Sequence, residues 1–187
     1  MDYKKKTRDT LVVVDMQNDF ITGTLANADA EAIVDPICKL IEQWPGYVIV
    51  TRDTHSRGYL GTSEGRHLPI VHCVRETAGW CVEDRIMRAL DEKDHVIVDK
   101  FHFGYEWWKS EDLLSFFQGD ICVVGTCTDV CVVSNVLIFK TLFPEADITV
   151  YEDLCAGTTP ERHRAAIETM KSCQVGILTY GPVEKQG

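Results

Sequence analysis

Short runs of apolar residues recur along the whole chain, and their spacing predicts buried β-strands. Strands of a parallel sheet are covered on both faces, so their sequences read as unbroken apolar stretches rather than as alternating ones. Six runs have this character and are rich in β-branched side chains, at residues 11–14, 47–50, 95–98, 121–124, 148–151 and 175–178.

Stretches with helical spacing separate these runs, at residues 30–42, 82–90, 110–117, 130–142 and 160–172. Strands that alternate with helices form parallel sheets with helices on both faces. We predict an α/β fold of three layers, with one six-stranded parallel sheet in the order 3-2-1-4-5-6 that is usual for doubly wound folds. A chain of 187 residues without repeats or linkers is expected to form a single domain, residues 1–187.

Residues 51–80 interrupt this rhythm, because they are rich in glycine and histidine and show no clear period. Long segments without regular structure are uncommon inside compact domains, and those that occur are usually functional. We therefore expect this segment to contribute to a site.

The charge of the chain narrows the range of partners. A net charge of −10 and a pI near 5.0 disfavour binding to nucleic acid and to anionic membrane surfaces. No window contains the roughly 18 apolar residues that a membrane span requires. A small-molecule substrate is the default expectation, with no nucleic acid and no membrane as partner.

The cysteines indicate the compartment. The first apolar run is broken at once by Asp15, so no export signal is expected, and the eight cysteines are expected to be reduced thiols of a cytoplasmic protein. No two of them have the spacing of zinc knuckles or of dithiol redox sites. This weakens a redox or zinc-finger interpretation, including one that uses Cys127 and Cys131 as a pair.

Polar residues follow four of the predicted strands directly. In open parallel sheets, ligands bind beyond the carboxyl ends of the strands. Asp15 follows the first run, Asp53 and His55 the second, and Lys100 the third, while Cys131 comes shortly after the fourth. With the first and fourth strands as neighbours, Asp15 is expected to lie beside Cys131.

Cys131 is expected in the first turn of the helix at 130–142, where Thr128 or Asp129 can cap the helix. The helix dipole and the Lys100 ammonium would both favour the thiolate, and free amides of this turn would receive a developing oxyanion. Each residue also has an ordinary alternative. Cys131 is equally compatible with a small core residue, Asp15 with a capping residue and Lys100 with a solvated loop charge.

Three motifs resemble those of the isochorismatase-like cysteine hydrolases, and among these most closely the nicotinamidases. The first is the run at 12–20 that contains Asp15, the second is Asp99-Lys100 with Phe103-Gly104 behind it, and the third is the run at 125–132 that contains Cys127 and Cys131. The motifs span most of the chain in the family's order. The resemblance implies a hydrolase of amide C–N bonds that acts in NAD salvage, with nicotinamide as the expected substrate.

The same resemblance implies roles for the residues at the strand ends. Cys131 would attack the amide carbonyl, Asp15 would take the thiol proton and pass it to departing ammonia, and Lys100 would hold the charges in place. The family also has a cis peptide bond at the position of Thr126–Cys127, which turns the backbone amides of Cys127 and Cys131 toward the oxyanion.

The long segment supplies four candidate metal ligands, which are Asp53, His55, Glu64 and His72. Carboxylate and imidazole donors suit a divalent transition metal. Related nicotinamidases bind one such ion, so zinc is the expected cofactor, with manganese or iron as alternatives, and the ion would hold the pyridine nitrogen. His67 competes with Glu64 as a ligand and ranks lower. Scattered, solvated loop polars are the alternative interpretation.

Aromatic residues near the motifs are candidates for the walls of a substrate pocket, chiefly Phe20, Trp80 and Tyr105. Trp107 and Trp108 are compatible with a wall, with the core or with a contact between subunits of the expected homo-oligomer. His102 would either gate the pocket or lie in a solvated loop.

Two further interpretations remain open. The same thiol could hydrolyse another small amide, carbamoyl or ureido compound. A catalytically silent relative that acts as a binding subunit is disfavoured by the intact trio of acid, lysine and thiol.

Overall fold

The strands form one parallel sheet. The computed structural model describes residues 8–181, so the predicted domain, 1–187, extends beyond the described range at both ends. All neighbouring strands pair in parallel, in the order β3-β2-β1-β4-β5-β6, which confirms the predicted fold class. The strands are β1 (Thr10–Val14), β2 (Tyr47–Asp53), β3 (His95–Lys100), β4 (Ile121–Thr126), β5 (Ile148–Ala156) and β6 (Gly176–Leu178).

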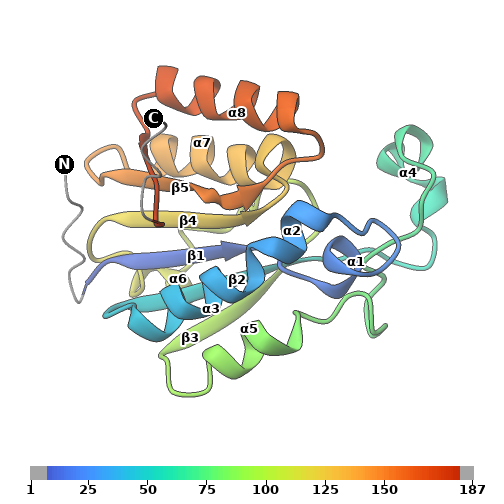
Figure 1. Cartoon of the computed structure of the whole chain (residues 1–187), viewed down its shortest axis with the longest axis horizontal. Coiled ribbons are helices and arrows are strands. Elements are labelled where there is room, and N and C mark those ends of the chain that lie inside the picture. Colours follow the sequence, from blue (N-terminus) through green and yellow to red (C-terminus); the bar gives the residue numbers. More distant parts are fainter. Residues whose placement is uncertain (1–7, 182–187) are drawn as a thin grey trace, which may run out of the picture.

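Helices cover both faces of the sheet, because each face presents its own set of apolar side chains (Figure 1). One core cluster contains Leu11, Val13 and Val50 of the sheet, and the other contains Val12, Val14 and Ile49. Helices on the first face are α2 (Ala28–Ala32), α3 (Val34–Gln43) and α5 (Asp84–Ala89), and those on the second are α6 (Glu111–Leu114), α7 (Val133–Leu142) and α8 (Pro160–Ser172).

Two predicted helices differ from the observed ones. The stretch at 30–42 forms two helices that meet at Ile33, which ends α2 and precedes α3. Pro36 explains the break, because it has no N–H to donate to the carbonyl of Ala32 and is tolerated only in the first turn of α3. The stretch at 110–117 is helical only over Glu111–Leu114. Within the described range, no helix has the length and apolar character that a membrane span requires.

The irregular segment after β2 lies at the carboxyl end of the sheet. Figure 1 shows α4 (Ser63–His67) standing at the end of the molecule toward which β1 points, close to α1 (Asn18–Ile21). A short 3₁₀ turn at Tyr59–Gly61 precedes α4, and a β-bridge between His55 and Val74 ties the two arms of the segment together. The segment therefore contains regular structure and is held by a defined backbone contact.

Candidate active site

The strand order brings the predicted reactive residues to one place. Asp15 directly follows β1, Asp53 and Lys100 are paired in register at the ends of β2 and β3, and Cys131 lies in the turn after β4. These side chains are almost fully buried, with exposed fractions of 0% for Asp15 and Lys100, 4% for Asp53 and 6% for Cys131. The predicted neighbourhood of Asp15 and Cys131 follows from the pairing of β1 with β4.

Lys100 stands at the centre of this group. Its Nζ lies 2.8 Å from Asp15 Oδ2, 3.2 Å from Asp53 Oδ1 and 3.4 Å from Cys131 Sγ. It also donates to the carbonyl of His102 at 3.2 Å. One ammonium thus contacts two carboxylates and the thiol, in a place that water does not reach.

Burial and charge act in opposite directions on these groups. Burial lowers the pKa of the Lys100 ammonium, but the charges of Asp15, Cys131 and Asp53 outweigh it, and the pKa lies well above its ordinary value. Burial raises the pKa of the Asp15 carboxyl, and Lys100 offsets this only in part. Lys100 is therefore held as a cation beside a carboxylate of increased basicity.

The Cys131 thiol does not meet the electrostatic expectation. Burial raises its pKa well above the ordinary value, and the Lys100 ammonium does not compensate because the charges of Asp15 and Asp53 add to the effect of burial. This shift favours the protonated thiol over the expected thiolate. A thiol that acts as a nucleophile in this position needs a base to remove its proton. Asp15 contacts the same Lys100 ammonium as Cys131 does.

Cys131 lies in a π-helical turn, Thr128–Val132, that leads into α7. Neither Thr128 nor Asp129 caps this turn, contrary to the prediction. Asp129 instead accepts hydrogen bonds from the N–H and the hydroxyl of Thr158 at 2.7 and 2.5 Å, and Thr128 Oγ1 contacts His163 Nδ1 at 2.9 Å. The turn is thus fastened to the connection between β5 and α8.

The peptide bond between Thr126 and Cys127 is cis, as the resemblance implied. Asp15 adopts a left-handed backbone conformation, with φ of 49°, directly after β1. Thr51 on the neighbouring strand holds it there, because its hydroxyl donates to Asp15 Oδ1 at 2.6 Å and its carbonyl accepts from the Asp15 N–H at 3.2 Å. Such a conformation persists only where its surroundings fix it.

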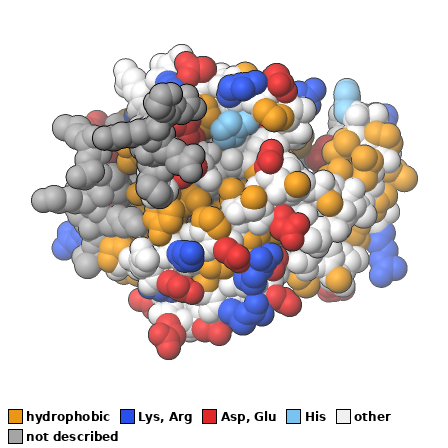
Figure 2. All heavy atoms as spheres, viewed as in Figure 1, with side chains coloured by type: hydrophobic (Ala, Val, Ile, Leu, Met, Phe, Trp, Pro, Cys, Tyr) orange, Lys and Arg blue, Asp and Glu red, His pale blue; other side chains and the backbone are white. Residues whose placement is uncertain are grey.

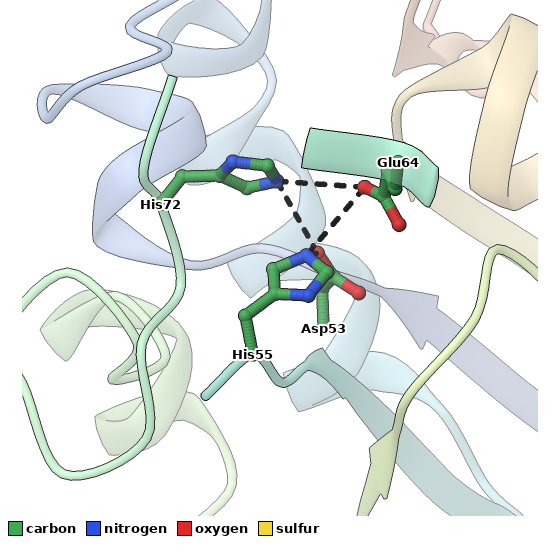
Figure 3. Close-up of side chains that lie close together, drawn as sticks. All are labelled: Asp53, His55, Glu64 and His72. Atoms are coloured by element: carbon green, nitrogen blue, oxygen red, sulfur yellow. Dashed lines mark ion pairs between the residues drawn. The ribbon is translucent and has the colours of Figure 1, made fainter. Parts of the chain in front are cut away.

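The four predicted metal ligands converge on one point (Figure 3). Each offers one ligand atom, and these atoms all lie within 4.8 Å of one another. His55 Nε2 is 2.8 Å from Asp53 Oδ2 and 3.6 Å from Glu64 Oε1, and His72 Nε2 is 3.5 Å from the same Asp53 oxygen. Glu64 comes from α4 and His72 from the irregular return of the segment.

The chemistry of this cluster fits a divalent cation. Apart from its 2.8 Å contact with the Asp53 carboxylate, the buried His55 Nε2 has no hydrogen-bond partner among the described residues, and its lone pair can bind a metal beside that carboxylate. Burial raises the pKa of Asp53, but Lys100 and the two histidines outweigh it and hold that pKa well below its usual range. An anionic carboxylate, a second carboxylate on Glu64 and two imidazoles form a donor set typical of zinc, manganese or iron.

Gln17 fixes the backbone of Asp53. This fully buried side chain accepts from the Asp53 N–H at 2.7 Å and donates to the Asp53 carbonyl and to the Trp80 carbonyl, each at 2.9 Å. Thr54 faces away from the cluster, as expected for an extended chain, and its hydroxyl accepts from Trp80 Nε1 at 2.8 Å. Asp53 can therefore direct one oxygen to Lys100 and the other to the histidines.

A cavity of about 660 Å³ opens above these groups. We call it the inner cavity. Cys131, Cys127, Asp53, Glu64 and His72 line it, and Phe20 forms part of its wall, as predicted, with its ring 5.7 Å from that of His72. Phe103 and Arg162, which carried no predicted role, also line the inner cavity.

Trp80 and Tyr105 are not among the residues that line the inner cavity, so these two wall predictions are wrong. Trp80 packs beneath the Arg52 guanidinium, whose Cζ lies 3.7 Å from the centre of the Trp80 ring. Tyr105 packs edge-on against Trp107 and Trp108. Trp108 is a core residue with 0% exposure, and Trp107 is half exposed.

The remaining histidines lie outside the cluster. His67 is exposed and its Nδ1 contacts the Ser63 carbonyl at 2.8 Å, so Glu64 and not His67 reaches the cluster. His102 is exposed on the loop after β3, and its backbone carbonyl is what contacts Lys100.

Asn135 was missed by sequence reasoning. It is fully buried on α7, donates to the carbonyls of Cys131 and Phe103, and accepts from the N–H of Tyr105 and from Trp108 Nε1. It therefore holds the segment after Lys100 against the helix that follows the nucleophile. An asparagine directly before the apolar run at 136–139 is the signal that could have identified it, because a polar side chain in such a place needs hydrogen-bond partners.

Comparison with known proteins identifies the relatives of this arrangement. A sequence model of the Isochorismatase domain matches residues 9–180. The chain belongs to the isochorismatase family. This confirms the resemblance drawn from the three motifs and identifies the chain as a hydrolase of this family.

Relatives of this isochorismatase-family chain include a nicotinamidase of Saccharomyces cerevisiae, which is 29% identical over 90% of this chain and 98% of its own length. Solved structures share the fold at lower identity. PnC1 from L. infantum in complex with nicotinate is 21% identical, covers 96% of both chains and gives a TM-score of 0.83. Pyrazinamidase of Pyrococcus horikoshii in complex with zinc is 23% identical, covers 92% of this chain and 99% of its own, and gives a TM-score of 0.74.

We expect Gln17→Leu to destabilise the protein by roughly 2–4 kcal/mol. The substitution leaves the N–H and carbonyl of Asp53 and the carbonyl of Trp80 without their buried partner, and each unsatisfied group costs about 1–3 kcal/mol, with partial relaxation. Urea unfolding monitored by fluorescence measures the change. Asn18→Ala is the matched control, because Asn18 is the next residue along the chain and its side chain makes one hydrogen bond near the surface, to the Ala78 carbonyl. Equal losses in the two variants would contradict a special role for Gln17.

The reactivity of the Cys131 thiol is expected to respond in opposite directions to its two charged neighbours. Asp15→Asn removes a negative charge and lowers the thiol pKa, whereas Lys100→Met removes the cation and raises it. Below the pKa, each unit of change alters the thiolate fraction about tenfold. Alkylation of Cys131 by iodoacetamide at pH 8, followed by peptide mass spectrometry, is therefore expected to be faster in Asp15→Asn and slower in Lys100→Met. Similar rates in both variants would show that these charges do not control the thiol.

Proposed function

We propose that this protein is a nicotinamidase, which hydrolyses nicotinamide to nicotinate and ammonia. The observation that carries the proposal is one cavity lined by the Cys131 thiol, with Asp15 and Lys100 buried behind it, and by three residues of the metal cluster, Asp53, Glu64 and His72. The first set suits attack on an amide carbonyl, and the second suits a heteroaromatic nitrogen at the other end of the same small molecule. The named relatives, a nicotinamidase and a pyrazinamidase, support this choice.

In the first half of the reaction, Asp15 accepts the proton of the Cys131 thiol, and the thiolate attacks the amide carbon. The backbone amides of Cys127 and Cys131 donate hydrogen bonds to the oxyanion. Asp15 then returns the proton to the nitrogen, the C–N bond breaks, and ammonia leaves a thioester on Cys131. Its raised pKa makes the Asp15 carboxylate a better base for this transfer.

In the second half, water replaces ammonia beside Asp15. The carboxylate takes a proton from the water while its oxygen attacks the thioester carbon, and the same backbone amides receive the second oxyanion. The C–S bond breaks, the proton on Asp15 returns to the Cys131 sulfur, and the product leaves as nicotinic acid, which loses its remaining proton to solvent and becomes nicotinate. Lys100 remains a cation throughout, because its pKa lies well above the ordinary value, and it balances the negative charge that moves between Asp15 and Cys131.

Asp53, His55, Glu64 and His72 would hold one divalent metal ion, of which zinc fits the ligand set best. When bound, the ion supplies a coordination position for the ring nitrogen. The phenyl ring of Phe20 packs beside this position, against His72, and limits where a flat ring can lie. These residues orient the amide toward Cys131.

The setting of this activity is part of the proposal. Nicotinamide hydrolysis belongs to NAD salvage, and reduced cysteines suit a cytoplasmic enzyme. Cys38, Cys81, Cys127 and Cys173, which are exposed or half-buried, are free thiols. A homo-oligomer remains a prediction.

Cys131→Ala is expected to abolish ammonia release from nicotinamide, because no other group can form the thioester. Cys127→Ala is the matched control, since it removes a neighbouring thiol and keeps the backbone amide, and we expect it to retain most of the activity. A coupled ammonia assay over a panel of nicotinamide and of carbamoyl and ureido compounds measures both effects and ranks the substrates. Loss of activity in Cys127→Ala with an unchanged fold would favour a mechanism that uses both cysteines.

Removal of the metal is expected to reduce kcat/KM for nicotinamide far more than for an activated amide without a ring nitrogen. Loss of residues that only support a ligand costs about 10- to 100-fold, so His72→Ala is expected to cost at least this much and to lower the zinc content. His95→Ala is the control, because this histidine is exposed at the start of β3. Elemental analysis and the ammonia assay are the measurements. Full nicotinamide turnover by the metal-free protein would refute the metal's role and the nicotinamidase assignment with it.

A further inference from the structure

A second cavity adjoins the inner one. It has a volume of about 770 Å³, and we call it the outer chamber. Small-molecule pockets commonly measure about 300–1,000 Å³, so each of the two spaces is large enough to hold a ligand group. The walls that they share are Glu64, Leu68, Phe103, Val130, Thr158 and Arg162. A single-ring amide bound at Cys131 would leave the outer chamber free.

The charges around the outer chamber differ from those of the chain as a whole. The protein has a net charge of −10, yet the outer chamber is lined by Arg162 and by three histidines, of which His55 belongs to the metal cluster and His67 and His102 do not. Glu64 is the carboxylate in its lining, and that side chain faces the histidines of the metal cluster. An anion that enters the outer chamber therefore meets the Arg162 guanidinium and, outside the metal cluster, the imidazoles of His67 and His102, the second of which lies 4.0 Å from Glu106 Oε2.

Arg162 is available to a ligand. Its guanidinium makes no ion pair with a carboxylate anywhere in residues 8–181, and its one hydrogen bond there is a long contact of 3.4 Å from Nη1 to Thr158 Oγ1. Thr158 is itself fastened to Asp129 of the nucleophile's turn by two short hydrogen bonds. The arginine thus borders both cavities, next to a fixed part of the active site.

Apolar side chains complete the outer chamber. Phe101 and Phe103 remain 45% and 46% exposed, and Leu68 is 36% exposed. Figure 2 shows hydrophobic side chains gathered at the end of the molecule where α4 lies, beside this opening. An apolar linker would cover these surfaces and leave the Arg162 guanidinium for an acidic end.

We propose that the outer chamber binds a carboxylate joined to the substrate ring by a short apolar arm, with Arg162 as the specificity-determining residue. The substrates would then include pyridine carboxamides that carry an acidic substituent on a ring carbon remote from the amide. This inference rests on the proposed function, because it places the amide at Cys131. A planar guanidinium donates two parallel N–H groups to a carboxylate, which favours this anion at Arg162.

The test compares two ligands that differ only in charge. One is nicotinamide with a carboxyalkyl arm on a remote ring carbon, and the other has a methyl ketone in place of the carboxylate. Dissociation constants are measured by calorimetry on the zinc-loaded Cys131→Ala protein, which cannot cleave them, and kcat/KM is measured on the enzyme with Cys131 intact. Each measurement is repeated with Arg162→Gln and with Arg164→Gln. Arg164 is the matched control, because it lies on the same helix outside both cavities and pairs with Glu161.

We expect the carboxylate ligand to bind roughly fivefold more tightly than the ketone, which is the upper range for a partly exposed charge pair. The preference is expected to vanish in Arg162→Gln, to persist in Arg164→Gln and to weaken in added salt. Equal binding of the two ligands, or a preference that survives Arg162→Gln, would overturn the proposal. Turnover of unmodified nicotinamide tests the proposed function separately. If that turnover is absent while the charge preference is present, the nicotinamidase assignment is wrong and the proposed carboxylate site in the outer chamber is retained.

Discussion

The buried ammonium of Lys100 is the interaction on which the rest of the site depends. A charge taken out of water is very costly unless it is paired, and Lys100 is paired with Asp15 and Asp53 at once. One cation between two carboxylates leaves an excess of negative charge. The second oxygen of Asp53 faces His55 and His72, where a divalent cation would balance that excess. Asp53 therefore joins the lysine of the catalytic group to the metal cluster.

Burial also explains why Cys131, the proposed nucleophile, favours the protonated thiol. Exclusion of water raises the pKa of both Cys131 and Asp15, whereas Lys100 stays a cation despite the same burial because negative charges surround it. The proton can then move between the two groups with little change in how the surrounding charges are arranged, because Lys100 contacts both. A thiolate held permanently in this cavity would instead add a third negative charge around one ammonium.

Much of this arrangement could be predicted from the sequence, because it depends on short-range periodicity. Unbroken apolar runs marked the strands, and the residues that follow them lie at one edge of a parallel sheet. The alternation of an extended chain placed Asp53 and His55 on the same side. The resemblance added the cis bond and the ligand from α4, and the structure contains both.

What could not be predicted depends on contacts between distant segments. Trp80 was expected to line the substrate pocket, but its indole donates a hydrogen bond to Thr54 and packs against Arg52. Neither contact follows from the local sequence. Asp129 was expected to cap the helix, but its carboxylate accepts hydrogen bonds from Thr158, which lies far along the chain. The Cys131 thiolate was expected from the helix dipole and Lys100 alone, because the burial of Cys131 is known only once the fold is known. The same long-range contact gives the site its rigidity: the loop that holds the nucleophile's turn through Asp129 also leads into α8 and presents Arg162 at the rim. Cys131, the proposed nucleophile, and Arg162, the proposed recognition residue, are therefore positioned by one connected piece of the structure.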